Sequence, residues 1–256
     1  MLLLHGWMVN ADINWLGCYQ PLIDAGYRVL AVDHRGHGRG LRSLEPFRLT
    51  DCADDAAALL SALGAAPAIA VGYSMGGPIA QLLARGHPRL LAGLVLCATT
   101  REWQGREFER LWRMMGLVRL VVSLSPFGFW TTLLRVSGVP QDERTGWLVA
   151  ELGRGAPGAL AEAGRELGRF DSRGWIDGLA VPAAVVVTAH DRSVPPSKQR
   201  ALAEALGAAR FEIPGDHLVV AEEGGPFNAA LLAALAHVAG AGWGEGPGSR
   251  AAGAPA

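Results

Sequence analysis

A glycine-rich turn at residues 72–77, Gly-Tyr-Ser-Met-Gly-Gly, joins an apolar run to a helix-like stretch and limits the folds open to this chain. The run Ala68–Val71 before it is typical of a buried strand. A turn from strand to helix within so few residues strains the backbone of its central residue, and Gly72 and Gly76 leave room for it. The pattern G-x-S-x-G therefore predicts that the Ser74 Oγ is held above a sheet. A dinucleotide-binding turn is excluded because Ser74 occupies the position of the second required glycine.

Short runs of Val, Leu and Ala alternate with helical patterns along most of the chain. Because these runs are apolar on both faces, they predict a mostly parallel sheet covered by helices, which is an α/β fold. The predicted strands are Leu2–Leu4, Arg28–Val32, Ala68–Val71, Leu94–Ala98, Val181–Thr188 and Arg210–Ile213.

Residues 101–178 interrupt this alternation with helical patterns alone, and they contain five of the eight tryptophans. We interpret this segment as an inserted helical lid, and residues 1–100 with 179–238 as the core. Thr50 and Asp51 predict the cap and acidic first turn of a helix that runs to Leu63. The last helix is predicted from Phe227 to Val238, before a Gly/Pro/Ala-rich tail, 239–256, that we expect to be disordered.

Composition excludes several classes of partner. The formal net charge is −1 and the pI is about 6.7, so no long-range field attracts nucleic acid or an anionic membrane. Cys18, Cys52 and Cys97 are too few and too widely spaced for a disulfide framework or a zinc site, and we expect them to be buried. The apolar stretch between Arg119 and Arg135 is too short and too broken to span a bilayer, so we expect no membrane span. The expectation is a cytoplasmic protein that binds a small molecule, with no cofactor and no metal.

A serine hydroxyl needs a base to take its proton, and the base needs a third group to orient it. Asp191 follows the strongest predicted strand, and His217 follows the next one. The chain order Ser74, Asp191, His217 matches one of the known arrangements of such a triad. We therefore predict Ser74 as nucleophile, His217 as base and Asp191 as its orienting acid.

Other histidines and acids compete for these roles. His34 and His37 have a spacing that suggests a metal, but no Cys or carboxylate cluster completes a coordination shell, so we interpret them as structuring their loop. Glu102 and Asp216 are rival acids, and neither has the position of Asp191, after the strand that comes one before the strand leading to His217. Asp191 is therefore preferred.

The oxyanion of an acyl-transfer reaction needs two N–H donors. The backbone N–H of Met75 follows the nucleophile directly, and the backbone N–H of Trp7 follows His5 and Gly6 after the first strand. We predict these two amides as the oxyanion hole, although Trp7 could equally be a pocket wall. A lid over the site needs an apolar face, so its aromatic residues are candidates for the substrate pocket, while each ring alone could instead hold the lid together. The candidates are Trp103, Trp112, Phe129, Trp130 and Trp147.

Together these residues resemble the α/β-hydrolase superfamily, in its lidded serine-hydrolase branch. The resemblance covers the chain to about Val238 and includes the HG-x segment, the D-x-R-G-x-G turn at residues 33–38, and the Ser, Asp and His above. Serine at position 74 argues against the haloalkane dehalogenase and epoxide hydrolase branches, which use a carboxylate nucleophile.

Members of this family carry two further strands and a hairpin before the HG-x segment, whereas this sequence begins at the strand that leads into it. The family's strand order implies an open edge at the strand Arg28–Val32, and open apolar edges invite pairing with other chains. We therefore expect the natural protein to be longer.

The resemblance implies a serine hydrolase that cleaves a small to medium, apolar ester or thioester through an acyl-enzyme. Carbon–carbon bond hydrolysis and cofactor-free haloperoxidase or perhydrolase activity remain open on the same fold. A non-catalytic ligand-binding relative is an alternative of another class, and a truncated product that does not fold is a third possibility.

Overall fold

The computed structural model describes residues 1–105, 109, 112–136, 139, 141–222 and 224–242. Within them a six-stranded sheet has the order β2-β1-β3-β4-β5-β6, and all neighbouring strands are parallel. The predicted α/β fold is confirmed, and the strand boundaries lie within three residues of those expected, with Leu2–Leu4 matching at both ends. The strands are β1 (Leu2–Leu4), β2 (Leu30–Val32), β3 (Ala68–Tyr73), β4 (Leu91–Cys97), β5 (Ala183–Thr188) and β6 (Ala209–Ile213).

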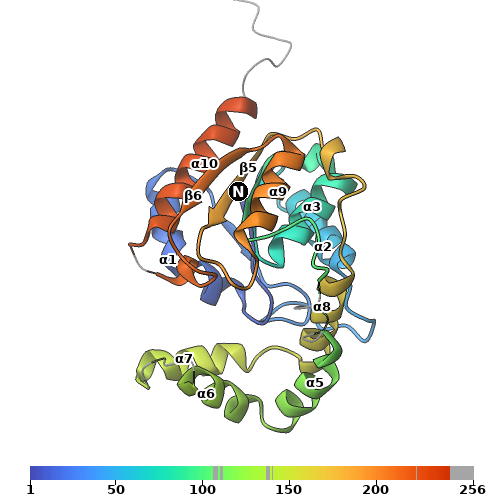
Figure 1. Cartoon of the computed structure of the whole chain (residues 1–256), viewed down its shortest axis with the longest axis vertical. Coiled ribbons are helices and arrows are strands. Elements are labelled where there is room, and N and C mark those ends of the chain that lie inside the picture. Colours follow the sequence, from blue (N-terminus) through green and yellow to red (C-terminus); the bar gives the residue numbers. More distant parts are fainter. Residues whose placement is uncertain (106–108, 110–111, 137–138, 140, 223, 243–256) are drawn as a thin grey trace, which may run out of the picture.

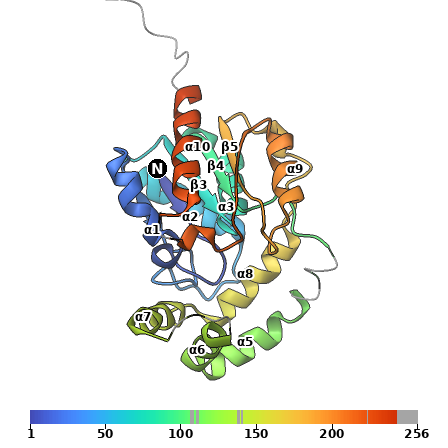
Figure 2. The ribbon, with the colours of Figure 1, turned by 60° about the vertical axis from the view of Figure 1, so that its left-hand side comes forward.

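Helices cover both faces of the sheet (Figures 1 and 2). Helices α1 and α10 pack on one face, and α2, α3 and α9 pack on the other, which gives two hydrophobic cores separated by the strands. The α-helices are α1 (Ala11–Asp24), α2 (Leu49–Ala62), α3 (Gly76–Gly86), α5 (Met115–Leu124), α6 (Pro126–Val136), α7 (Glu143–Leu152), α8 (Pro157–Arg169), α9 (Pro196–Leu206) and α10 (Pro226–Gly242), and the 3₁₀ helices are η1 (Pro88–Leu90), η2 (Ile176–Gly178) and η3 (Val219–Ala221).

Two helix ends differ from the prediction. Helix α2 begins at Leu49, and its N-cap residue Arg48 makes no side-chain cap bond, so the predicted Thr50 cap is wrong. The buried Leu49 side chain belongs to the core, which draws the helix start toward it. Helix α10 continues to Gly242, four residues past the predicted end, because small apolar residues carry the helical pattern on. The rest of the predicted tail, 243–256, lies outside the described residues.

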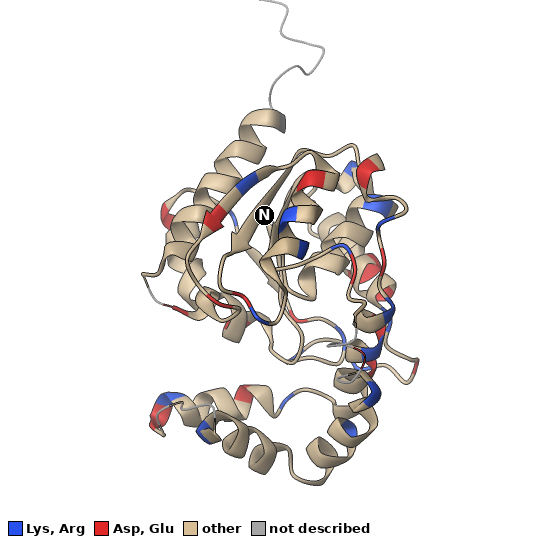
Figure 3. Ribbon diagram, viewed as in Figure 1, with Lys and Arg blue, Asp and Glu red and all other residues tan. Residues whose placement is uncertain are grey.

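The segment between β4 and β5 contains α5 to α8 among its described residues, and α5, α6 and α7 form a separate layer beside the core (Figures 1 and 2). Charged residues are sparse on α6 (Figure 3). Among the described residues no single helix is long and apolar enough to cross a membrane, and the apolar pair α5 and α6 is bent by 112° at its break. This segment also exposes large apolar side chains, at Leu117, Leu120, Leu124, Phe127, Leu133 and Val136.

Candidate active site

Ser74 lies on the tight turn between β3 and α3, and its backbone has a φ of 50°, in the left-handed region. A non-glycine residue there is strained, so the surrounding packing must hold it. A Cβ at Gly72 would lie 2.3 Å from the Gly76 carbonyl oxygen, and a Cβ at Gly76 would lie 2.0 Å from the Leu4 carbonyl oxygen. Neither contact is tolerable, so both glycines are required for this close approach of helix to strand.

Ser74, His217 and Asp191 form a chain of hydrogen bonds. The His217 Nε2 lies 3.0 Å from the Ser74 Oγ, and its Nδ1 lies 2.7 Å from an Asp191 carboxylate oxygen. Because a carboxylate only accepts, Nδ1 carries the proton of the neutral ring and Nε2 is left to accept from the Ser74 hydroxyl. The three residues follow β3, β5 and β6, so they meet at the carboxyl edge of the parallel sheet.

The Asp191 carboxylate is buried and fully hydrogen-bonded. One oxygen accepts from the backbone N–H groups of Ser193 and Val194, each at 2.8 Å. The other accepts from His217 and from the Thr188 hydroxyl, the latter at 2.9 Å. Burial alone would raise the pKa of Asp191, but the hydrogen bond and charge of His217 and the other donors outweigh it, so the pKa lies below its usual value. The carboxylate is therefore charged at neutral pH and holds the His217 ring in one orientation.

Tyr73 fixes the loop that carries His217. Its hydroxyl donates to the His217 carbonyl oxygen at 2.9 Å, and its ring packs against the His217 ring with centroids 5.7 Å apart. The sequence analysis did not single out Tyr73 for this role, although it lies directly before Ser74 in the turn.

The segment His5-Gly6-Trp7 runs beside Ser74. A Cβ at Gly6 would lie 3.4 Å from the Ser74 Cβ, and the Gly6 N–H donates to the Asn14 side-chain oxygen at 2.9 Å. Within the described residues, no acceptor pairs with the backbone N–H of Trp7 or of Met75. These are the two amides predicted to bind the oxyanion.

Three buried histidines, His5, His34 and His37, support this segment, and we call them the three-histidine cluster. His5 donates from Nδ1 to the Gly6 carbonyl oxygen at 2.7 Å and accepts at Nε2 from the His34 N–H at 3.0 Å. Burial lowers the pKa of His5 to about 4 and that of His37 to about 3. Burial, followed by the neighbouring histidines, lowers the pKa of His34 as well. The cluster is therefore neutral, and the described part of the chain contains no group of three or more His, Cys, Asp or Glu side chains that could hold a metal ion.

The rival acids are engaged elsewhere. Glu102 pairs with the Lys198 ammonium at 2.9 Å. Asp216 is exposed, and its carboxylate accepts from the Leu218 N–H at 2.7 Å. The predicted burial of Cys18, Cys52 and Cys97 is confirmed.

A small cavity of about 130 Å³ opens beside Ser74 and His217. Its wall is mostly apolar. Most wall residues lie shortly after the HG-x segment or shortly after His217 in the sequence, and this closeness was the signal that could have identified them. The wall residues that the sequence analysis missed are Val9, Ile13, Asn14, Leu218, Val220 and Ala221.

None of the five predicted pocket aromatics lines this cavity. Trp103 is buried in the core under α3, and Trp112 packs against the same core and against Trp7. Phe129 and Trp130 join a small cluster with the cavity residues Val9 and Ile13, so they support its wall from behind. Trp147 is 36% exposed on α7. The clustering of these rings in the sequence does not show which face of each helix they occupy, so it could not place them relative to this cavity.

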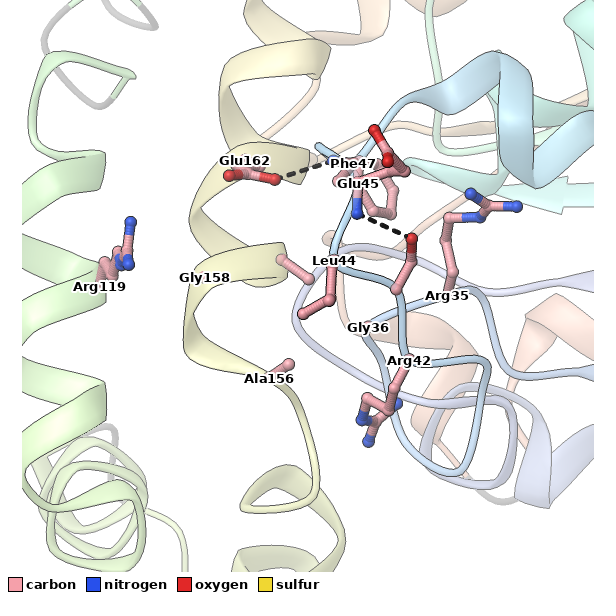
Figure 4. Close-up of a pocket in the computed structure, with 12 residues that line it drawn as sticks. Arg35, Gly36, Arg42, Leu44, Glu45, Phe47, Arg119, Ala156, Gly158 and Glu162 are labelled. Carbon is pink, nitrogen blue, oxygen red and sulfur yellow. Dashed lines mark hydrogen bonds between the residues drawn. The ribbon is translucent and has the colours of Figure 1, made fainter.

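A larger cavity of about 290 Å³ lies between the loop 42–47 and helix α8, away from Ser74 (Figure 4). Two of its three arginines are already occupied. Arg35 pairs with Asp51 and Asp55, and Arg42 donates to backbone carbonyl groups. Figure 4 shows these two side chains pointing apart, so they do not converge on one anion.

Comparisons with known proteins identify the family to which this fold belongs. A family model described as alpha/beta hydrolase fold matches residues 1–227. A pimeloyl-[acyl-carrier protein] methyl ester esterase of Neisseria meningitidis (serogroup B, strain H44/76) is 31% identical over 220 residues, which are 82% of this chain and 82% of that protein. A non-heme chloroperoxidase of Streptomyces lividans is 39% identical over 93 residues, 36% of this chain and 33% of that protein.

A solved structure of a thermophilic esterase from Thermogutta terrifontis has a TM-score of 0.77 and 26% identity, and the match covers 93% of this chain and 89% of that one. The family match spans most of the described core, and the relatives named above include two esterases. The chain therefore belongs to the α/β-hydrolase fold family, and it is a hydrolase of that family.

Proposed function

We propose that the protein is a serine hydrolase that cleaves a small to medium, largely apolar carboxylic ester or thioester through an acyl-enzyme. The observation that carries this proposal is the continuous hydrogen-bond chain from the Ser74 hydroxyl through His217 to Asp191. Such a chain supplies the nucleophile, its base and the group that orients the base.

In the first step the Ser74 Oγ attacks the carbonyl carbon of the ester while the His217 Nε2 takes its proton. The carbonyl oxygen becomes an oxyanion, to which the backbone N–H groups of Trp7 and Met75 donate. The imidazolium is stabilised by the buried Asp191 carboxylate, and it then protonates the departing alcohol or thiol. The acyl group remains on Ser74.

In the second step water takes the place of the leaving group. His217, neutral again, removes a proton from the water, which attacks the acyl-enzyme and passes through a second oxyanion at the same two amides. Collapse of this intermediate returns the proton to Ser74 and releases the carboxylic acid.

The substrate class follows from the wall of the cavity. Val9, Ile13, Leu218 and Val220 give it an apolar lining, and its volume of about 130 Å³ suits a short alkyl or aryl group. A dry cavity of about 150 Å³ is large enough for a benzene ring. We propose that the helical segment 101–178 acts as a lid over this site, and that larger parts of the substrate extend toward it.

The test is a panel of p-nitrophenyl esters and acyl thioesters of increasing acyl length, assayed with the wild type, Ser74→Ala and His217→Gln. His190→Gln is the matched control because His190 is exposed and lies next to the acid in sequence. We expect turnover that prefers short apolar acyl groups, a loss of roughly 10⁴-fold or more in both site variants, and no change in the control. A preference for charged acyl groups would refute the substrate class, and equal turnover by Ser74→Ala would refute the mechanism.

A second candidate is perhydrolysis, in which hydrogen peroxide replaces water in attacking the acyl-enzyme and a peracid leaves. The similarity to a non-heme chloroperoxidase favours including it. Peracid formation from an ester and hydrogen peroxide, abolished in Ser74→Ala, would support this activity. Ester turnover without peracid would exclude it. Carbon–carbon bond hydrolysis is tested by adding a ring-fission diketone to the panel, and a long-lived covalent adduct with no turnover would indicate a ligand-binding relative.

A further inference from the structure

The segment 7–10 carries the Trp7 amide into the site, and its backbone is strained. Met8 has a φ of 69°, in the left-handed region, although it is not glycine. A non-glycine residue in this conformation is strained, and it persists only where its surroundings hold it. The contacts that hold this segment therefore decide where the Trp7 N–H points.

The first contact comes from helix α8. The Trp7 indole N–H donates to the Leu160 carbonyl oxygen at 2.7 Å. The Trp7 ring also packs on α8 where Gly164 leaves space, because a Cβ at Gly164 would lie 2.9 Å from the ring. Leu160 is 153 residues away in the chain, so this bond ties the segment 7–10 to a helix that is distant in the sequence.

The second contact comes from helix α7. The Asn10 side-chain N–H donates to a Glu151 carboxylate oxygen at 2.8 Å, and these residues are only 2% and 4% exposed. The other Glu151 oxygen accepts from Arg39 and Arg154, which holds the carboxylate in place. The Asn10 oxygen is committed to capping α1, where it accepts from the Ile13 N–H. Asn10 therefore joins the start of α1 to α7 through a buried, charge-assisted bond.

We propose that helices α7 and α8 position the Trp7 backbone N–H through these two hydrogen bonds, so that the oxyanion site is complete only while the helices are docked on the core. The Trp7 indole and the Asn10 side chain are positioning groups, because they act on the amide and not on the reacting atoms. This inference rests on the proposed function. It makes the helical segment part of the machinery that stabilises the transition state, in addition to a cover over the site.

The test removes each bond without removing the amide. Trp7→Phe deletes the indole N–H, and Asn10→Ser keeps a side-chain oxygen that can cap α1 but loses the donor to Glu151. Glu162→Ala is the matched control. Glu162, on α8, also accepts a hydrogen bond from the core, at the Phe47 N–H, but it does not touch segment 7–10.

Two readouts separate positioning from a general structural effect. One is kcat and KM for a short p-nitrophenyl ester, and the other is the affinity of a short alkyl trifluoromethyl ketone, whose adduct with Ser74 places an oxyanion in the same site. Loss of a whole oxyanion donor costs about 10²-fold to 10³-fold. For a displaced donor we expect about a tenfold loss in kcat and in ketone affinity, with KM within about twofold, and no change in the control.

Three results would overturn the proposal. The first is wild-type values in both Trp7→Phe and Asn10→Ser. The second is an equal loss in Glu162→Ala, which would assign the effect to any loosening of the helices. The third is a change in KM alone.

Melting temperatures identify a variant that fails to fold, in which case the other variant decides. End-point fluorophosphonate labelling of Ser74 separates the two proposals. Labelling of Ser74 in the wild type and in the variants would show that the nucleophile is still activated, so that a loss of kcat reflects the oxyanion site. No labelling in the wild type would contradict the proposed function, and this inference with it.

Discussion

Replacing Asp191 with asparagine exchanges one oxygen for an NH₂ group and should nearly abolish catalysis. One carboxylate oxygen accepts from two backbone N–H groups, those of Ser193 and Val194, each at 2.8 Å. An asparagine has a single acceptor oxygen, and placing its NH₂ group against two donors leaves three donors facing one another. The amide oxygen must therefore occupy that position, because backbone N–H groups cannot turn away. The NH₂ group then faces the His217 Nδ1, 2.7 Å away in the wild type, and the Thr188 hydroxyl, which can rotate to accept.

This orientation forces the wrong tautomer on His217. With Nδ1 accepting from the asparagine, the ring proton moves to Nε2 and points at the Ser74 Oγ, 3.0 Å away. The base can then no longer accept the serine proton. We expect kcat to fall by about 10⁴-fold, which corresponds to roughly 5 kcal/mol in the activation barrier. The fold should remain because the side chain keeps its shape.

The assay is the turnover of a p-nitrophenyl ester by the wild type, Asp191→Asn and Asp216→Asn, with melting temperatures measured in parallel. Asp216 is exposed and is the matched control for the same substitution beside His217 in sequence. An Asp191→Asn variant that folds and keeps kcat within tenfold of the wild type would refute this reasoning. An equal loss in Asp216→Asn would show that the loss in Asp191→Asn is not specific to the proposed acid.

Three further outcomes are expected. Glu151→Gln should lower the free energy of unfolding, measured in urea, by about 2–4 kcal/mol. The reason is that the buried Asn10 N–H donor and the two arginines then face an amide in place of a carboxylate. Glu109→Gln, in an exposed ion pair, should change it by less than about 0.5 kcal/mol. Equal effects would contradict this. Gly76→Ala should yield little folded protein, because its Cβ would lie 2.0 Å from a β1 carbonyl oxygen. The control is Gly86→Ala in the same helix, where an added Cβ meets nothing within 4 Å. Equal melting temperatures of the two variants would contradict this prediction. Unfolded histidines gain protons below a pKa of 6.5, whereas burial lowers the pKa of His5 to about 4 and that of His37 to about 3 in the folded protein. Stability should therefore decrease as the pH falls from about 6.5 toward 4, by up to about 1.4 kcal/mol per pH unit for each of these two histidines, and the lowered pKa of His34 acts in the same direction. An unchanged melting temperature between pH 7 and pH 5 would contradict this.

The turn at Ser74 was predictable because its geometry is local. Gly72 and Gly76 are needed where a helix approaches a strand, and that requirement is visible in six consecutive residues. The alternation of apolar runs and helical patterns likewise predicted the sheet and its order of elements. Parallel strands then bring residues that follow β3, β5 and β6 to one edge, which explains why Ser74, Asp191 and His217 could be chosen together.

The cavity wall was not predictable in the same way. Trp103 and Trp130 are buried in separate clusters, and only the packing of helices whose positions the sequence does not state decides this. The bonds from Asn10 to Glu151 and from Trp7 to Leu160 span 141 and 153 residues, so no local pattern announces them. The Thr50 cap failed for a related reason, since the buried Leu49 side chain outweighed the local cap preference.

An activated Ser74 reacts with a fluorophosphonate at its Oγ, and an idle serine does not. The decisive measurement is the incubation of wild-type protein and Ser74→Ala with such a probe, followed by mass spectrometry of the labelled peptide. We predict a single label on Ser74 in the wild type and none in the variant. Folded wild-type protein without label at Ser74, or label that persists in Ser74→Ala, would contradict the assignment of this serine as the nucleophile.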